Sequence, residues 1–138
     1  MHLTDRTDYG LRVLLFLAQR PSPRPRPARV LAEAFSVSES HLAKVIQALA
    51  ACGYVRTVPG RGGGVVLAAD PQELTLGAVV RALEPMTIAP CFGGDTTCPY
   101  VGRCGLAGVL DDAQQAFLHV LDGKTLHQAV QATGPQAG

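Results

Sequence analysis

The sequence predicts a mainly α fold with a small β-hairpin wing: a winged helix-turn-helix followed by a long C-terminal dimerisation helix. Two short amphipathic segments, 28–35 and 38–52, are separated by a tight turn, which is typical of a helix-turn-helix. Two strand-like runs then flank a glycine-rich turn at 59–64, which indicates a hairpin. Apolar residues in 105–121 are spaced alternately four and three apart, the pattern of a helix that pairs with a second helix.

Length and composition favour one domain in a reducing compartment. With 138 residues, 47% of them hydrophobic, the chain can bury a core of its own. It opens with polar residues and has no apolar run long enough to span a membrane, so we expect a cytoplasmic protein without a membrane partner. Residues 1–71 carry nine Lys and Arg against five Asp and Glu, whereas 72–138 carry three against six. This basic first half favours a polyanionic partner.

The predicted elements follow one another with short connections. We expect a helix at 3–19, an extended Arg/Pro-rich linker at 20–27, helices at 28–35 and 38–52, strands at 54–58 and 65–68, a helix at 74–84, the long helix at 105–121 and a short helix at 124–132. They group into a winged helix-turn-helix domain at 1–84, a cysteine-rich loop at 85–104, and a dimerisation helix with a C-terminal helix at 105–132. Residues 133–138 are expected to be disordered.

Polar residues on the second helix and at the wing point to double-stranded DNA as the partner. Ser38, Ser40, His41 and Lys44 lie off the apolar stripe of that helix, where a helix-turn-helix meets the major groove. Arg61 stands alone in the glycine-rich tip, where it can contact the DNA backbone or enter the minor groove. A glycine-rich turn also serves geometry alone. It is not a nucleotide-binding P-loop, because no Gly-Lys-Ser/Thr follows.

The cysteine-rich loop carries three of the four cysteines of the chain. Cys91, Cys98 and Cys104 are spaced C-x6-C-x5-C, with glycines and a proline between them that disfavour a helix or strand. Three cysteines cannot all pair within one chain, and thiolates bind zinc or an iron–sulfur cluster. The spacing does not separate these alternatives, and both typically need a fourth ligand from elsewhere. Cys52, which closes the second helix of the helix-turn-helix, is not expected to be that ligand.

Several motifs, in this order, resemble those of the iron–sulfur winged-helix regulators, and among them the nitric-oxide-sensing repressors. They are the segments 3–12, 37–45, 53–55, 60–64 and the cysteine loop, which together cover nearly the whole chain. The resemblance implies a homodimeric transcriptional repressor that binds palindromic promoter DNA and carries one cluster per subunit near the dimer interface. It also implies that nitric oxide attacks the cluster and releases the DNA.

The resemblance also gives a fourth ligand on the first helix. It implies that Asp8 of one subunit completes a [4Fe–4S] cluster of the other, with Arg12 holding the carboxylate by a charged hydrogen bond. A plain surface ion pair between the two is the alternative, and His2, His119 and His127 remain open as ligands. A [2Fe–2S] cluster also stays open, although relatives that hold one use a Glu and a His at these two helix positions.

Other interpretations keep or abandon the fold. Relatives that sense cluster supply carry a histidine at the position of Ala107, which disfavours that role. A structural zinc site, or a sensor of redox or iron status, would suit the same fold. An electron carrier has no use for a recognition helix, and no nucleophile–histidine arrangement indicates an enzyme. The linker at 20–27 is unusual for the family, and its arginines are expected to be solvated rather than bound to phosphate.

Overall fold

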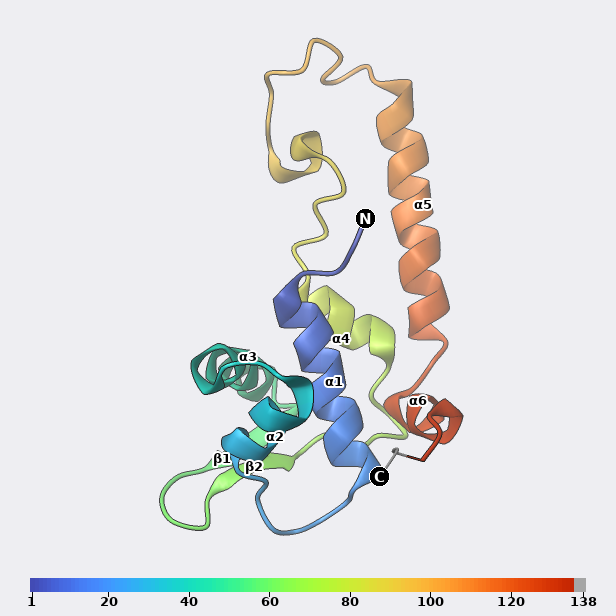
Figure 1. The fold of residues 1–138 in the computed structure, drawn as a ribbon. Helices are drawn as coiled ribbons and strands as arrows, with labels where there is room; N and C mark the ends of the chain where they lie inside the picture. Colours follow the sequence, from blue (N-terminus) through green and yellow to red (C-terminus); the bar gives the residue numbers. More distant parts are fainter. Residues whose placement is uncertain (136–138) are drawn as a thin grey trace.

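The computed structural model describes residues 1–135 and confirms the mainly helical fold with a two-stranded antiparallel hairpin (Figure 1). The elements are α1 (Asp5–Gln19), α2 (Ala28–Phe35), α3 (Glu39–Ala51), β1 (Val55–Val58), β2 (Gly64–Leu67), α4 (Leu76–Leu83), the 3₁₀ helix η1 (Pro90–Gly93), α5 (Gly105–Asp122) and α6 (Leu126–Ala132). Within the described range, no helix combines the length and apolar character needed to cross a membrane. Part of the tail expected to be disordered, 136–138, lies outside the described residues.

Helix α1 is the centre of the body. It packs against α3, α4, α6 and β2. The side chains that face inward halfway along α1 are apolar, and two of them, Val13 and Leu14, have no exposed surface. Burial of a Val or Leu side chain contributes about 1.5–3 kcal/mol relative to exposure. The opposite face stays in solvent and carries Asp8 and Arg12.

The helix-turn-helix is formed by α2 and α3, as predicted. Helix α2 ends at Ser36, whose backbone is left-handed (φ 54°) and whose N–H donates to carbonyls of the last turn. Helix α3 begins after Ser38, whose hydroxyl accepts a hydrogen bond from the His41 N–H at 3.2 Å. The buried side chains of α3 are those of its predicted apolar stripe: Leu42, Val45, Ile46 and Leu49.

The wing is larger than the two predicted strands. In the β1–β2 ladder Val55 is opposite Leu67 and Val58 is opposite Gly64. On the other edge of β2, Arg26 of the linker forms a bridge with Val65, with N···O distances of 2.8 and 2.9 Å. The segment 20–27, predicted only as an extended linker, therefore pairs with the sheet at Arg26. This residue keeps the backbone N–H that its proline neighbours lack.

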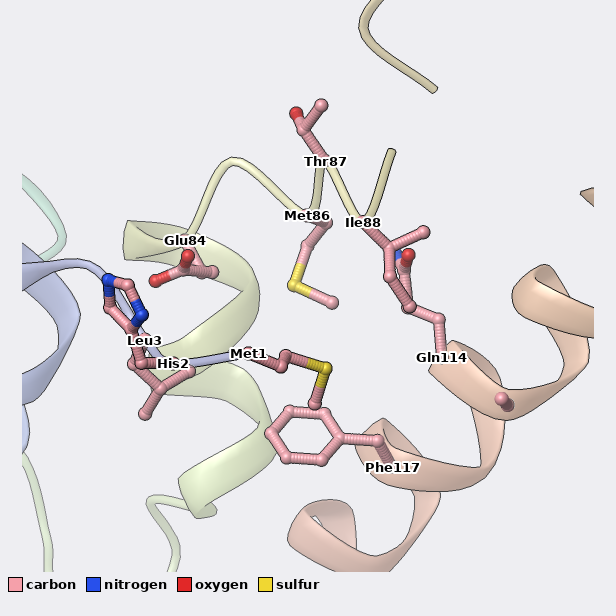
Figure 2. Close-up of a pocket in the computed structure, with 10 residues that line it drawn as sticks. Met1, His2, Leu3, Glu84, Met86, Thr87, Ile88, Gln114 and Phe117 are labelled. Atoms are coloured by element: carbon pink, nitrogen blue, oxygen red, sulfur yellow. The ribbon is translucent and has the colours of Figure 1, made fainter. Parts of the chain in front are cut away.

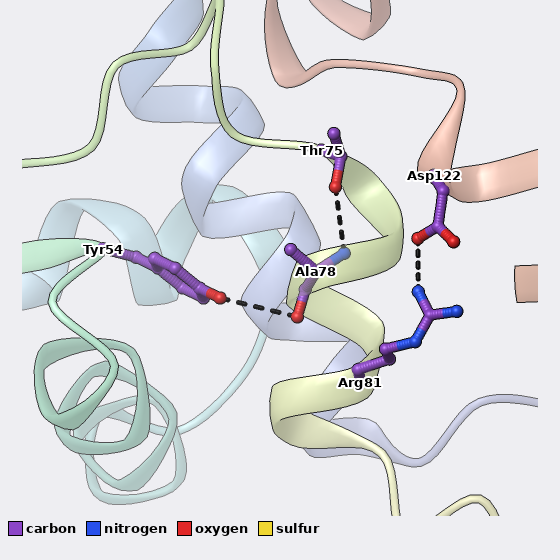
Figure 3. Close-up of polar contacts among 5 residues, drawn as sticks. All are labelled: Tyr54, Thr75, Ala78, Arg81 and Asp122. Atoms are coloured by element: carbon purple, nitrogen blue, oxygen red, sulfur yellow. Dashed lines mark hydrogen bonds and ion pairs between the residues drawn. The ribbon is translucent and has the colours of Figure 1, made fainter. Parts of the chain in front are cut away.

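Helix α4 is held from two sides (Figure 3). Toward the hairpin, the Tyr54 hydroxyl donates to the Ala78 carbonyl at 3.4 Å. Toward α5, Arg81 forms an ion pair with Asp122. A Cβ placed on Gly77 would overlap the Asp122 carboxylate, so only glycine permits this approach of the two helices.

Helix α5 stands away from the body and α6 returns to it (Figure 1). Large apolar side chains on α5 are exposed: Leu106 at 72%, Val109 at 65% and Val120 at 65%. In α6, Leu126 is buried against the body, and its N–H donates to the Leu74 carbonyl at 2.8 Å. The cysteine-rich loop, 85–104, joins α4 to the far end of α5.

Gly77→Ala is expected to destabilise the protein by about 1–3 kcal/mol, because the added methyl group forces α4 and Asp122 apart. Gly108→Ala is the matched control, since that glycine is also helical but faces open space; it should gain about 0.5–1 kcal/mol of helix propensity. Urea unfolding of both variants measures the difference. Equal stabilisation by the two substitutions would show that the Gly77 contact is dispensable.

Candidate metal centre and nucleic-acid interface

The three loop cysteines are free thiols positioned by three different local structures. Cys91 lies in η1, Cys98 lies in the turn-rich segment that follows, and Cys104 is the N-cap residue of α5. Cys91 and Cys98 are exposed and Cys104 is half-buried. Thiolates of this kind suit zinc or iron–sulfur ligation. Across residues 1–135, however, no three His, Cys, Asp or Glu side chains lie close enough together to hold a metal ion.

Asp8 and Arg12 form the ion pair expected from their spacing. Arg12 Nε donates to Asp8 Oδ1 at 2.9 Å, and a second guanidinium nitrogen lies 2.9 Å from Oδ2. The side chains are 40% and 51% exposed, respectively, so the pair contributes at most about 1 kcal/mol to stability. The carboxylate is oriented and accessible, which leaves it able to accept a further partner.

Arg12 also connects this pair to α3, the helix predicted to read DNA, and the sequence did not predict this link. Its guanidinium lies over the Tyr9 ring, 5.3 Å from the centroid. The Tyr9 ring in turn meets His41 of α3 edge-on, with centroids 5.5 Å apart. Asp8, Arg12, Tyr9 and His41 therefore form a continuous row of contacts from α1 to α3. The only feature of the sequence that pointed to this row of contacts was the position of the aromatic Tyr9 directly after the acidic Asp8.

The predicted DNA-reading residues fall into two groups. Ser40 and Lys44 are exposed on α3, and Arg61 is exposed at the tip of the wing. Ser38 and His41 already make contacts within the protein: the hydroxyl of the exposed Ser38 caps α3, and the half-buried His41 packs on Tyr9. The capping role follows from the position of a serine just before the helix. The exposed members offer polar or cationic groups to a nucleic acid.

Glu84 ties the start of α1 to the start of the cysteine loop. Its carboxylate accepts hydrogen bonds from the Thr4 N–H at 3.1 Å and from the Thr4 hydroxyl at 2.9 Å. Burial acts to raise the pKa of Glu84. Nevertheless, the Thr7 hydroxyl, the two Thr4 donors and the nearby His2 together hold this pKa below its usual value. The Thr4 side chain thus binds Glu84 instead of capping α1.

Just beyond Glu84 the chain enters the loop beside an apolar cavity of about 350 Å³ (Figure 2). Met86 has a left-handed backbone (φ 57°), which is rare for a residue with a side chain and marks a constrained turn. Figure 2 shows Met1, Met86 and Phe117 around the cavity, from the N-terminus, the loop and α5. The base of the cysteine loop therefore shares this cavity with the N-terminal segment before α1 and with α5.

Comparison with known proteins decides the family. Residues 3–132 match the model of the Rrf2 family, described as iron-dependent transcriptional regulators. The chain belongs to the Rrf2 family. It is 44% identical to the HTH-type transcriptional regulator NsrR of Bacillus subtilis, over 94% of this chain and 90% of that one. It is 42% identical to NsrR of Geobacillus kaustophilus, over 91% and 87% of the two chains.

Solved structures give the same fold for this Rrf2 protein. The T. potens IscR structure matches with a TM-score of 0.75 at 25% identity, covering 99% of this chain and 94% of that one. CymR, the global cysteine regulator of B. subtilis, matches with a TM-score of 0.75 at 24% identity over 97% and 99%. This second likeness shows the fold alone. The chain is therefore a DNA-binding transcriptional regulator of the iron–sulfur type.

Glu84→Gln is expected to cost about 0.5–1.5 kcal/mol near neutral pH, because a neutral amide replaces the hydrogen-bonded carboxylate. The pKa of Glu84 is lowered by folding. Its contribution is therefore complete above the usual glutamate pKa, about 4.3, and is lost as the pH falls through the folded value. Urea unfolding of the two proteins at pH values from neutral down to below the glutamate pKa measures their free energies of unfolding, which should become equal as the pH falls.

Glu73→Gln is the matched control, since Glu73 is an exposed glutamate whose side chain accepts no hydrogen bond within 1–135. Its small effect should not depend on pH in the same way. A Glu84→Gln deficit that stays constant down to acidic pH would contradict the assignment of the effect to the carboxylate.

Proposed function

We propose that this chain is a homodimeric repressor that senses nitric oxide through a [4Fe–4S] cluster held by Cys91, Cys98 and Cys104, with Asp8 supplied by the second subunit. The observation that carries the proposal is the position of three free thiols, two exposed and one half-buried, on the loop between α4 and α5 of an Rrf2 fold. The NsrR name of the relatives fits the nitric-oxide-sensing repressors that the sequence resembles. We also propose a cytoplasmic location.

The exposed face of α5 supports the homodimer. Leu106 and Val120 lie at opposite ends of the predicted coiled-coil stripe and are 72% and 65% exposed. A row of apolar side chains along a helix that stands off the body is unfavourable in water and is buried by a second such helix. This arrangement supports the proposed division into a DNA-binding part (1–84), a cluster loop (85–104) and a dimerisation part (105–132).

The proposed ligand set indicates which of the four cluster ligands is bound most weakly. When bound, the cluster supplies iron that reacts with nitric oxide. Thiolate is a soft ligand, whereas the Asp8 carboxylate is hard and binds such iron more weakly. Asp8 is therefore the ligand most readily given up. Arg12, already within 2.9 Å of both carboxylate oxygens, orients Asp8 for ligation and receives it on release.

Two series of contacts carry a change at the loop to the DNA-reading helix. The first runs from Asp8 through Arg12 and Tyr9 to His41 on α3. The second runs from Glu84 along α4 to the Ala78 carbonyl, which accepts the Tyr54 hydroxyl just after α3 ends (Figure 3). A shift of either series repositions α3 and the wing relative to each other. This is the change that releases DNA.

The anaerobically purified chain should be brown, and titration with nitric oxide should bleach the visible spectrum and weaken DNA binding in parallel.

Cys91→Ser, Cys98→Ser and Cys104→Ser should lose the iron, whereas Cys52→Ser should keep it, because Cys52 closes α3 in the DNA-binding part. Asp8→Ala should change the cluster spectrum and its rate of reaction with nitric oxide. Iron content, spectra and stopped-flow kinetics measure these effects.

Asp5→Ala is the control for Asp8→Ala, because both carboxylates lie in the first turn of α1. An Asp8→Ala protein with the spectrum and kinetics of Asp5→Ala would reduce Asp8 to half of a surface ion pair. Colourless protein that retains zinc and binds DNA regardless of nitric oxide would replace the sensing function by a structural metal site.

Lys44→Ala or Arg61→Ala should weaken operator binding by about 1–3 kcal/mol if a base edge is read, or lower the salt slope by about one if phosphate alone is touched. Both side chains are exposed, so neither substitution is expected to disturb the core. Fluorescence anisotropy at several salt concentrations separates the two cases. Unchanged binding by both variants, with the metal content intact, would remove α3 and the wing tip from the DNA interface.

A further inference from the structure

A cavity of about 250 Å³ lies on the opposite side of the body from the cysteine loop, between the end of α1, the 20–27 linker and β2. Three of its lining residues are arginines, Arg20, Arg24 and Arg26, and none of its lining residues is acidic. The chain has no Asp or Glu from 9 to 32. The cavity is therefore a place where positive charge is concentrated by the fold.

The arginines are held there by specific contacts. The Arg26 backbone is bridged to Val65, and a Cβ on Gly64 would overlap the Arg26 carbonyl, so the linker lies directly on β2. The Arg20 guanidinium stacks on the Phe16 ring, 4.3 Å from its centroid. The backbone N–H of Arg24, an exposed residue, donates to the Ser22 hydroxyl at 3.1 Å and fixes a turn. These contacts make the linker part of the wing rather than a free tether.

The cluster of guanidinium groups lacks acceptors. Arg20 Nη1 and Arg26 Nε are both buried and have no hydrogen-bond partner among the described residues. Arg26 makes one long bond, 3.5 Å, to the Arg20 carbonyl. Asp70, next to two lining residues, accepts the Gln72 N–H at 2.9 Å and is not itself part of the lining. Buried charged donors without acceptors are costly, and an anion supplies both the charge and the acceptors.

We propose that this cavity binds a phosphate group. The planar fork of a guanidinium matches phosphate oxygens in charge and geometry. Three arginines line the cavity, and Arg20 and Arg26 each bring a buried guanidinium nitrogen to it. The phosphate has two sources with the same chemistry. One is the DNA backbone, since the same hairpin carries Arg61 at its tip; the other is a free phosphate-bearing molecule. The proposal departs from the expectation that these arginines are only solvated.

The test is a titration of the full, anaerobically purified chain with sodium phosphate, compared with sodium chloride at equal ionic strength. The ¹H–¹⁵N signals of the arginine Nε–H groups are followed. Arg26 should shift saturably with phosphate and not with chloride. Arg24→Gln should weaken this binding about tenfold, the loss of one charge-assisted contact. Arg29→Gln is the matched control, because Arg29 is an exposed neighbour that does not line the cavity.

No saturable shift, equal shifts with both salts, or equal weakening by the two variants overturns the proposal. This titration contains no DNA, so its failure is distinct from failure of the proposed repressor function. A second measurement assigns the source. If Arg24→Gln, but not Arg29→Gln, lowers the salt slope of DNA binding by about one, the phosphate belongs to the DNA backbone. If saturable phosphate binding is seen and the slope is unchanged, a free phosphate compound is the ligand.

Discussion

Burial of one face of α1 is the constraint on which the rest of the structure depends. Helices α3, α4 and α6 and strand β2 all pack on this helix, and Val13 and Leu14 at its centre have no exposed surface. Because the inner face is fixed by packing, the outer face is fixed too. Asp8, Arg12 and Tyr9 are therefore presented in one orientation, and a displacement of α1 is transmitted directly to α3 and β2, which pack on it.

Local patterns were enough to predict most of the fold. The apolar stripe of α3, the glycine-rich tip of the wing and the proline after α4 act over a few residues, and each produced the element expected. The cysteine spacing likewise located the loop that carries the candidate metal ligands. The pairing of Asp8 with Arg12 followed from helical geometry alone. Such features need no knowledge of the rest of the chain.

Contacts between distant segments could not be predicted in this way. Glu84 and Thr4 are 80 residues apart, and no sequence pattern around either residue predicts that they form a hydrogen bond. The bridge from Arg26 to Val65 was hidden by the prolines around it, and the row from Arg12 through Tyr9 to His41 depends on how α1 crosses α3. The ligand geometry of the cysteines belongs to the same class, because it depends on a second subunit under the proposed function.

The bridge between Arg26 and Val65 also limits pairing of the wing with a strand of another molecule. Strand β2 pairs with β1 on one edge and, through Val65, with Arg26 on the other, so the backbone groups of Val65 on that second edge are already paired and a foreign strand cannot bind them. Pro25 and Pro27, on either side of the bridge, have no N–H with which to extend the ladder outward. The sheet therefore ends where the linker lies on it. This protects a glycine-rich hairpin from edge-to-edge aggregation.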